Sequence, residues 1–104
     1  MLLMHSTKTA VNGTDYIVEY TILKKLSDYT EGNIFEYGIR CTLYEGGERV
    51  ISREEIQCIT PEYPDICRMV EILERNQVFP VHLKEIVCEL IELRLEQQEL
   101  PISA

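Results

Sequence analysis

The fold is decided by a change in the spacing of apolar residues within the stretch FEYGIRCTLYEGGERVISREEIQCITPEYPDICRMVEIL, residues 35–73. Before Thr60, apolar residues recur at every second position, as in a strand that buries one face. After Thr60 they recur at every third or fourth position, as along one face of a helix. A chain of this size with one period in each half is typical of the α+β class.

Three strands and one tight turn are predicted in the first half. Apolar residues alternate over residues 16–26 and again over residues 35–43. Gly46 and Gly47 can supply the positive φ angles of a two-residue hairpin turn. A third strand then extends from Arg49 to about Arg53.

The predicted turns set a strand register in which the apolar residues of all three strands fall on one face of the sheet. In this register Ile22 lies opposite Ile39, and Leu43 lies opposite Val50. A slip by one residue would scatter the apolar side chains over both faces, so the pattern and the turns support each other. The second strand is therefore predicted to be central, and the first and third strands to be edges.

Two amphipathic helices are predicted after Pro61. The first has an apolar stripe at helical spacing, formed by Ile66, Met69, Val70 and Leu73. Pro80 suits the first position of the second helix, because its missing N–H has no partner there in any helix. The apolar residues of this second helix extend beyond one stripe to Ile91 and Leu95.

The predicted fold is a three-stranded antiparallel β-meander followed by two α-helices packed on one face of the sheet. One α+β domain is expected to cover residues 15–100. Residues 1–14 have little periodicity and are predicted to be an N-terminal tail, and residues 101–104 a C-terminal tail.

The charge balance argues against several classes of partner. The chain has 18 acidic and 10 basic residues and a net charge of −8, so it should repel phosphate backbones. No stretch approaches the roughly 18 uninterrupted apolar residues of a membrane span. The first residues also lack the cationic flank of a signal peptide. We therefore predict a cytoplasmic protein without a nucleic-acid or membrane partner.

The cysteines do not suggest a metal site. The four are irregularly spaced and form no C-x-x-C pair. Structural zinc sites usually include at least one close pair of ligands, so we predict neither a metal nor another cofactor. We expect reduced thiols in the cytoplasm, with Cys41 and Cys88 buried because each falls on or near the core face of its element.

Three arginines mark the sheet face away from the helices as a candidate site. In the predicted register Arg40 lies opposite Arg53, with Arg49 on the same side. Like charges in these positions repel unless an anion lies between them. Glu19, on the diagonal from Arg40, can be that anion, and so can a bound phosphate or the carboxylate of a partner.

His82 and Glu85 form a second candidate pair, three residues apart at the start of the second helix. They can be read as an acid/base pair. The alternative is a capping or packing histidine, since the sequence places no serine or cysteine nucleophile beside it.

The string NQVFPVHL, residues 76–83, is followed by Glu85, Ile86 and Val87. This segment resembles the end of a family of short, uncharacterised bacterial proteins classed as a domain of unknown function. The resemblance covers about residues 16–93. It implies a small cytosolic bacterial protein and carries no activity or site residue to this chain.

Two function hypotheses follow. The first is a protein–protein interaction or regulatory module without catalytic activity, either a homodimer or an adaptor. It would use the surplus apolar residues Ile91 and Leu95, or the unpaired edge of the first strand. The alternative is a small-anion ligand-binding protein or minor enzyme that uses Arg40, Arg49 and Arg53.

Overall fold

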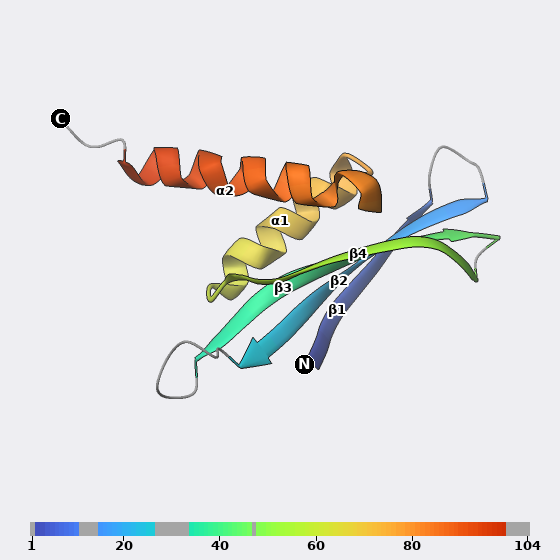
Figure 1. The fold of residues 1–104 in the computed structure, drawn as a ribbon, viewed down its shortest axis with the longest axis horizontal. Helices are drawn as coiled ribbons and strands as arrows, with labels where there is room; N and C mark the ends of the chain where they lie inside the picture. The colour runs from blue at the N-terminus through green and yellow to red at the C-terminus, as the bar shows by residue number, and fades with distance from the viewer. Residues whose placement is uncertain (1, 11–14, 27–33, 47, 100–104) are drawn as a thin grey trace.

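In the residues that it describes, the computed structural model has four antiparallel strands in one sheet and helices on one face of it (Figure 1). It describes residues 2–10, 15–26, 34–46 and 48–99, without the side chains of residues 2–10 and 94–99. The strands lie side by side in chain order: β1 (Leu2–Ala10), β2 (Tyr16–Leu26), β3 (Phe35–Glu45) and β4 (Arg49–Thr60). They are followed by α1 (Tyr63–Arg75), the short 3-10 helix η1 (Pro80–His82) and α2 (Leu83–Glu99). The predicted α+β class, with a meander followed by two helices, is confirmed.

The N-terminal residues form a strand where the sequence predicts a tail. β1 pairs with β2, from Leu2 opposite Lys24 to Ala10 opposite Ile17. The predicted tail is therefore wrong for residues 2–10, and β2 is an interior strand and not an edge. The pattern failed here because pairing uses backbone groups, which every residue of an edge strand has whether or not its side chains alternate. The predicted C-terminal tail lies outside the described residues.

The core lies between the sheet and the helices. The predicted pairing of β2 with β3 is confirmed, with Ile22 opposite Ile39. Both side chains are buried, and they belong to one cluster with residues of α1, of the α1–α2 connection and of α2. That cluster consists of Val18, Tyr20, Ile22, Ile39, Cys41, Ile66, Met69, Val70, Leu73, Val78, Leu83 and Val87.

The pairing of β3 with β4 differs from the prediction near the hairpin. Glu45 lies opposite Arg49, so three residues and not two form the loop, in which Gly46 has a φ of 66°. An extra residue in β4, Ile51, then places Leu43 opposite Ser52 and not opposite Val50. Paired glycines indicate a turn, but a three-residue loop with one left-handed residue suits them as well as a two-residue turn does.

A second irregularity bends β4 across β3. Three residues of β4, 57–59, lie opposite the single residue Gly38, and Cys58 has a positive φ of 55°. A Cβ on Gly38 would lie 2.2 Å from the backbone oxygen of Ile56, which is closer than atoms can approach without a bond. β4 can therefore cross β3 here only because Gly38 has no side chain.

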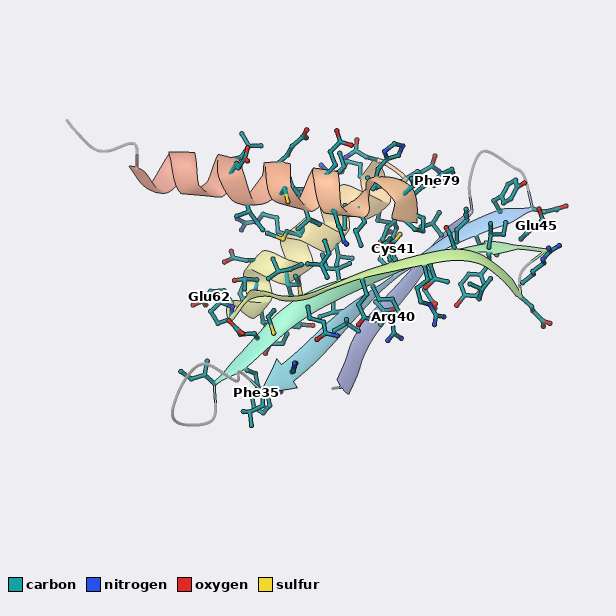
Figure 2. All side chains as sticks on the ribbon, in the orientation of Figure 1. Phe35, Arg40, Cys41, Glu45, Glu62 and Phe79 are labelled. Atoms are coloured by element: carbon teal, nitrogen blue, oxygen red, sulfur yellow. The ribbon has the colours of Figure 1, made fainter. Side chains whose placement is uncertain are left out.

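The connection between α1 and α2 is tied to the sheet. The Tyr20 hydroxyl donates a hydrogen bond of 2.8 Å to the backbone oxygen of Val78, and the Cys41 thiol lies 3.6 Å from the same oxygen. Both side chains are completely buried. Cys41 and Phe79 lie on the side of the sheet that faces the helices, whereas Arg40 lies on the other side (Figure 2). These contacts satisfy a buried carbonyl and determine where η1 and α2 begin.

Gly38→Ala is expected to lower the free energy of unfolding by about 2–3 kcal/mol, because the Ile56 and Gln57 backbone must move away from the new methyl group. Chemical denaturation followed by far-UV circular dichroism measures the loss. Gly46→Asn is the matched control, because Gly46 also has an unusual backbone but no atom lies within 4 Å of its Cβ position. A loss for Gly38→Ala no larger than that for the control would contradict the close approach.

Candidate functional site

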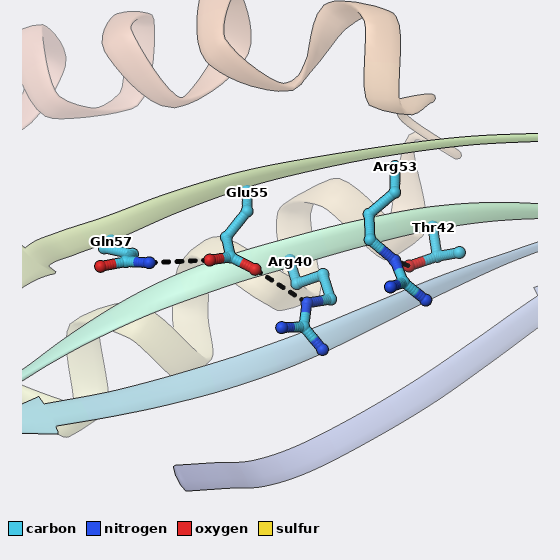
Figure 3. Close-up of polar contacts among 5 residues, drawn as sticks. All are labelled: Arg40, Thr42, Arg53, Glu55 and Gln57. Atoms are coloured by element: carbon cyan, nitrogen blue, oxygen red, sulfur yellow. Dashed lines mark hydrogen bonds and ion pairs between the residues drawn. The ribbon is translucent and has the colours of Figure 1, made fainter. Parts of the chain in front are cut away.

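The observed register gives Arg40 an acidic neighbour. Arg40 lies opposite Glu55 and not opposite Arg53. Its Nε atom is 2.9 Å from Glu55 Oε1, and the other carboxylate oxygen accepts a hydrogen bond of 2.8 Å from Gln57 (Figure 3). The three-residue loop and the extra residue Ile51 together move β4 by two positions, so the predicted contact between like charges is replaced by an ion pair.

Arg53 lies on the same face, opposite Thr42 and two residue pairs closer to the hairpin than Arg40. Its Nε atom donates to the hydroxyl of the buried Thr42, at 3.2 Å. Glu19 accepts a hydrogen bond of 2.8 Å from the Tyr44 hydroxyl, and this bond raises the pKa of Tyr44. The anion paired with Arg40 is Glu55, and Glu19 accepts its hydrogen bond at the Tyr44 end of this face.

Arg49 lies nearer the hairpin than the other two arginines. Its Nη1 atom is 3.6 Å from Glu45 Oε1, and its side chain is 80% exposed. Such an exposed pair contributes little to stability. Of the three arginines singled out in the sequence, the structure groups Arg40 and Arg53 and leaves Arg49 at the hairpin.

Glu55→Gln tests the ion pair through pH. Hydrogen bonds from Gln57 and Arg40 lower the pKa of Glu55. Its carboxylate therefore stabilises the fold above the unfolded-state pKa of about 4.3, and this contribution is lost as pH falls through the lower folded-state pKa. We expect Glu55→Gln to lower the free energy of unfolding by less than about 1 kcal/mol at neutral pH, and by progressively less below about pH 4.

Urea denaturation at several pH values measures this difference. Glu48→Gln, at an exposed position in the hairpin, is the control and should leave the free energy of unfolding unchanged at neutral and at acidic pH. An equal loss for Glu55→Gln at neutral and at acidic pH would show that the ionised carboxylate is not what stabilises the fold.

The cysteines are free and differ in their surroundings. Among the described residues, no three histidine, cysteine or acidic side chains lie close enough to hold a metal ion. Cys41 is buried as predicted, and burial raises its pKa to about 12. The predicted burial of Cys88 is wrong, because the buried residues of α2 are Leu83 and Val87 and Cys88 lies about 100° around the helix from Val87.

Thiol labelling should follow these surroundings. We expect Cys88 to react with an impermeant maleimide at the rate of a free thiol, and Cys41 to react only when the chain unfolds, because the thiolate is the reactive form. Peptide mass spectrometry after timed labelling measures both rates, and Cys88→Ser should remove the fast phase. Native-state labelling of Cys41 as fast as that of Cys88 would contradict its burial.

An open groove lies between the end of α1, the α1–α2 connection and α2. Its volume is about 470 Å³. The apolar lining consists of Ile72, Val78, Phe79, Ile86 and Leu90, and the polar lining of Asn76, Gln77, His82 and Glu89. Leu93, which is 54% exposed, extends the apolar stripe beyond Leu90 by one helical turn.

The predicted pair His82 and Glu85 lies beside this groove. His82 Nδ1 is 3.8 Å from Glu85 Oε2, which is longer than a hydrogen bond. Both side chains are more than half exposed. In this geometry the pair is a weak electrostatic contact at a solvent-exposed position.

The sequence indicated surplus apolar surface of α2 at Ile91 and Leu95. Ile91 is half-buried and packs against the core, and the side chain of Leu95 lies outside the described residues. Ile86 and Leu90 pack against the core in the same way and also line the groove, and the exposed Leu93 continues their row at i, i+4 and i+7. The wide apolar band of the helix indicated surplus apolar surface, but a local pattern does not show which part of that band α1 covers.

The family model of a family of unknown function, DUF6514, matches residues 1–93. The chain belongs to this family. The match confirms the resemblance seen in the sequence, and it includes the whole sheet and α2 as far as Leu93. No curated protein and no solved structure matches the chain. None of the helices in the described residues is long and apolar enough to cross a membrane.

Proposed function

We propose that the protein is a cytoplasmic protein-interaction module without catalytic activity, and that a protein partner binds in the groove beside α2. The observation that carries this proposal is the groove with a partly buried apolar lining from Ile72 to Leu90, which the exposed Leu93 extends. Folded monomers seldom leave contiguous apolar surface exposed unless it binds something. A groove lined by helices is also a common receptor for an amphipathic helix.

The dimensions of the chain support a binding role. Its radius of gyration is 15.2 Å, whereas a compact domain of this length has about 13 Å. The extents of 50 × 35 × 18 Å describe an elongated molecule. In Figure 1 α2 runs obliquely over α1 and its C-terminal end projects past α1, while the strands extend beyond the helices at the other end.

The edge strand β4 is a less suitable partner surface. In the described sheet it has β3 on one side only, so its other edge is open. Irregularities at Ile51 and at residues 57–59 interrupt its pairing pattern, and the regular part between them carries Arg53, Glu54 and Glu55. Bulges and charges of this kind protect edge strands from pairing with other chains.

Anion binding at Arg40 and Arg53 is the second candidate function. Figure 3 shows both guanidinium groups directed to the same side, with their Nε atoms bonded to Glu55 and Thr42. Two carboxylates, those of Glu19 and Glu55, lie on the same face and balance the two positive charges. This balance favours interaction through the groove over capture of a small anion.

Photo-crosslinking from position 93 tests the groove. A photoreactive amino acid in place of Leu93, in cells that produce the protein, should give a discrete covalent adduct on irradiation because this position borders the groove. The matched control is Val50, which is 48% exposed at the β3–β4 hairpin and should give none. Gel electrophoresis and mass spectrometry identify the adducts.

The same experiment separates the two candidate functions. Arg53→Glu should leave the adduct from position 93 unchanged, and it would abolish any binding of inorganic phosphate measured by calorimetry. No adduct from position 93, or adducts of equal yield from positions 93 and 50, would contradict binding in the groove.

A further inference from the structure

We infer that the chain forms a symmetric dimer in which β1 of one copy pairs with β1 of a second copy, so that the two sheets become one. The inference goes beyond the proposed function, because it concerns the edge of the sheet and not the groove. The observation behind it is that β1 is an edge strand of the described sheet and lacks most of the features that protect β4.

The backbone of β1 offers a row of hydrogen-bonding groups to a further strand. β1 is first in the strand order, so in the described sheet it has β2 on one side only. After an irregularity between Leu3 and His5, its pairing with β2 continues without interruption to Ala10. In an antiparallel strand alternate residues direct their N–H and C=O groups to opposite sides, so half of these residues direct them away from β2. The partner that satisfies such a row is another extended strand.

The uninterrupted part of β1 has little protection against pairing. Edge strands commonly avoid other chains through proline, bulges and charged side chains. The stretch HSTKTA, residues 5–10, has no proline, and Lys8 is its only residue that is charged at neutral pH apart from any protonated His5. The part of β4 between its two irregularities carries Arg53, Glu54 and Glu55. β1 is therefore the edge of this sheet that is better suited to pairing.

The distribution of charge identifies a second copy as a suitable partner for this edge. The chain has a net charge of −8, so two copies repel each other over most of their surfaces. All 18 acidic residues lie at or after Asp15, which makes residues 1–14 the longest stretch without a carboxylate. Two β1 strands can therefore pair without placing carboxylates opposite each other. Lys8 lies opposite its own copy only in a register centred on that residue.

The helix layer leaves the β1 edge accessible. α1 packs against β2, β3 and β4, and α2 packs against β4. In Figure 1 β1 is the strand farthest from α2. Two antiparallel copies of one strand are related by a two-fold axis perpendicular to the sheet, so the helices of both copies lie on the same face of the joined sheet. The two grooves beside α2 then open on that face as well.

Distances between spin labels test the symmetric pairing. A methanethiosulfonate label is placed on a single cysteine at each of positions 5–9, in a chain with Cys58→Ala, Cys67→Ala and Cys88→Ser. Cys41 is buried and stays unlabelled, and circular dichroism verifies the fold. The distance between the same residue of the two copies should rise by roughly 7 Å for each residue away from the axis, which is twice the rise of a strand. A label at position 50, on β4, is the control and should give a longer distance than any in β1.

Proline substitution separates the outward backbone groups from those that hold β1 to β2. Neighbouring residues direct their N–H groups to opposite sides, so one of Ser6→Pro and Thr7→Pro removes an N–H that pairs with β2 and the other removes an outward N–H. The variant that keeps the denaturation midpoint of the unaltered chain should dissociate at least about tenfold more readily in light scattering, because the loss occurs twice in a symmetric dimer. Ser6→Ala and Thr7→Ala retain both N–H groups and should leave the dimer unchanged.

The outcomes distinguish this inference from the proposed function. A chain that stays monomeric at high micromolar concentration, or a dimer without the distance gradient along β1, would overturn the pairing of β1 with a second copy. Either result would leave binding in the groove standing, since the adduct from position 93 is measured separately. Absence of that adduct in a chain that shows the distance gradient would overturn the proposed function alone.

Discussion

The crossing of β4 over β3 is the constraint on which the rest of the structure depends. At Gly38 the backbone of Ile56 comes so close that no Cβ can be accommodated, and residues 57–59 form the irregularity that makes this approach possible. Toward the hairpin, the extra residue Ile51 sets the remaining register. The same pairing places Glu55 beside Arg40, and the chain leaves the sheet at Thr60 to begin α1.

The helix layer depends on a second buried contact. The backbone oxygen of Val78 is held by the Tyr20 hydroxyl and lies against the Cys41 thiol, so the α1–α2 connection is attached to the two central strands. Burial raises the pKa of both side chains, which therefore stay neutral and can remain in the core. The start of α2 is held at this point, and α2 runs obliquely to α1 (Figure 1). The groove lies where α1, the connection and α2 meet.

The charged side chains on the two faces of the molecule differ in whether they have partners within the chain. On the sheet face Arg40 and Arg53 have partners within the chain, in Glu55 and Thr42. On the helix face, Glu89 lines the groove and belongs to none of the ion pairs among the described residues, whereas His82 has Glu85 as a neighbour. Free charges around an apolar lining are typical of a binding surface, with an apolar centre and a polar rim. This contrast is why the helix face, and not the arginine-bearing sheet face, is the stronger candidate for a functional surface.

Part of the candidate sites could be predicted from the sequence. The parity of the strand residues placed Arg40 and Arg53 on one face, and the wide apolar band of α2 indicated surplus apolar surface on that helix. The ion partner of Arg40 depends on the longer hairpin loop and on the extra residue Ile51, and the alternation of apolar residues does not reveal two such changes because together they leave the apolar face unchanged. The exposed part of α2 depends on the position of α1, to which no local pattern refers.

The sequence by itself determined the α+β class, the pairing of β2 with β3 and the two helices. These follow from periods of two and of three to four residues, which are local properties of the backbone. Only the tertiary structure decided the addition of β1, the register of β4, the exposure of Cys88 and the open groove beside Ile86 and Leu90. Each of these depends on how segments distant in the sequence meet: an edge strand is held through backbone groups common to all residues, and a helix face is exposed only where no other element covers it.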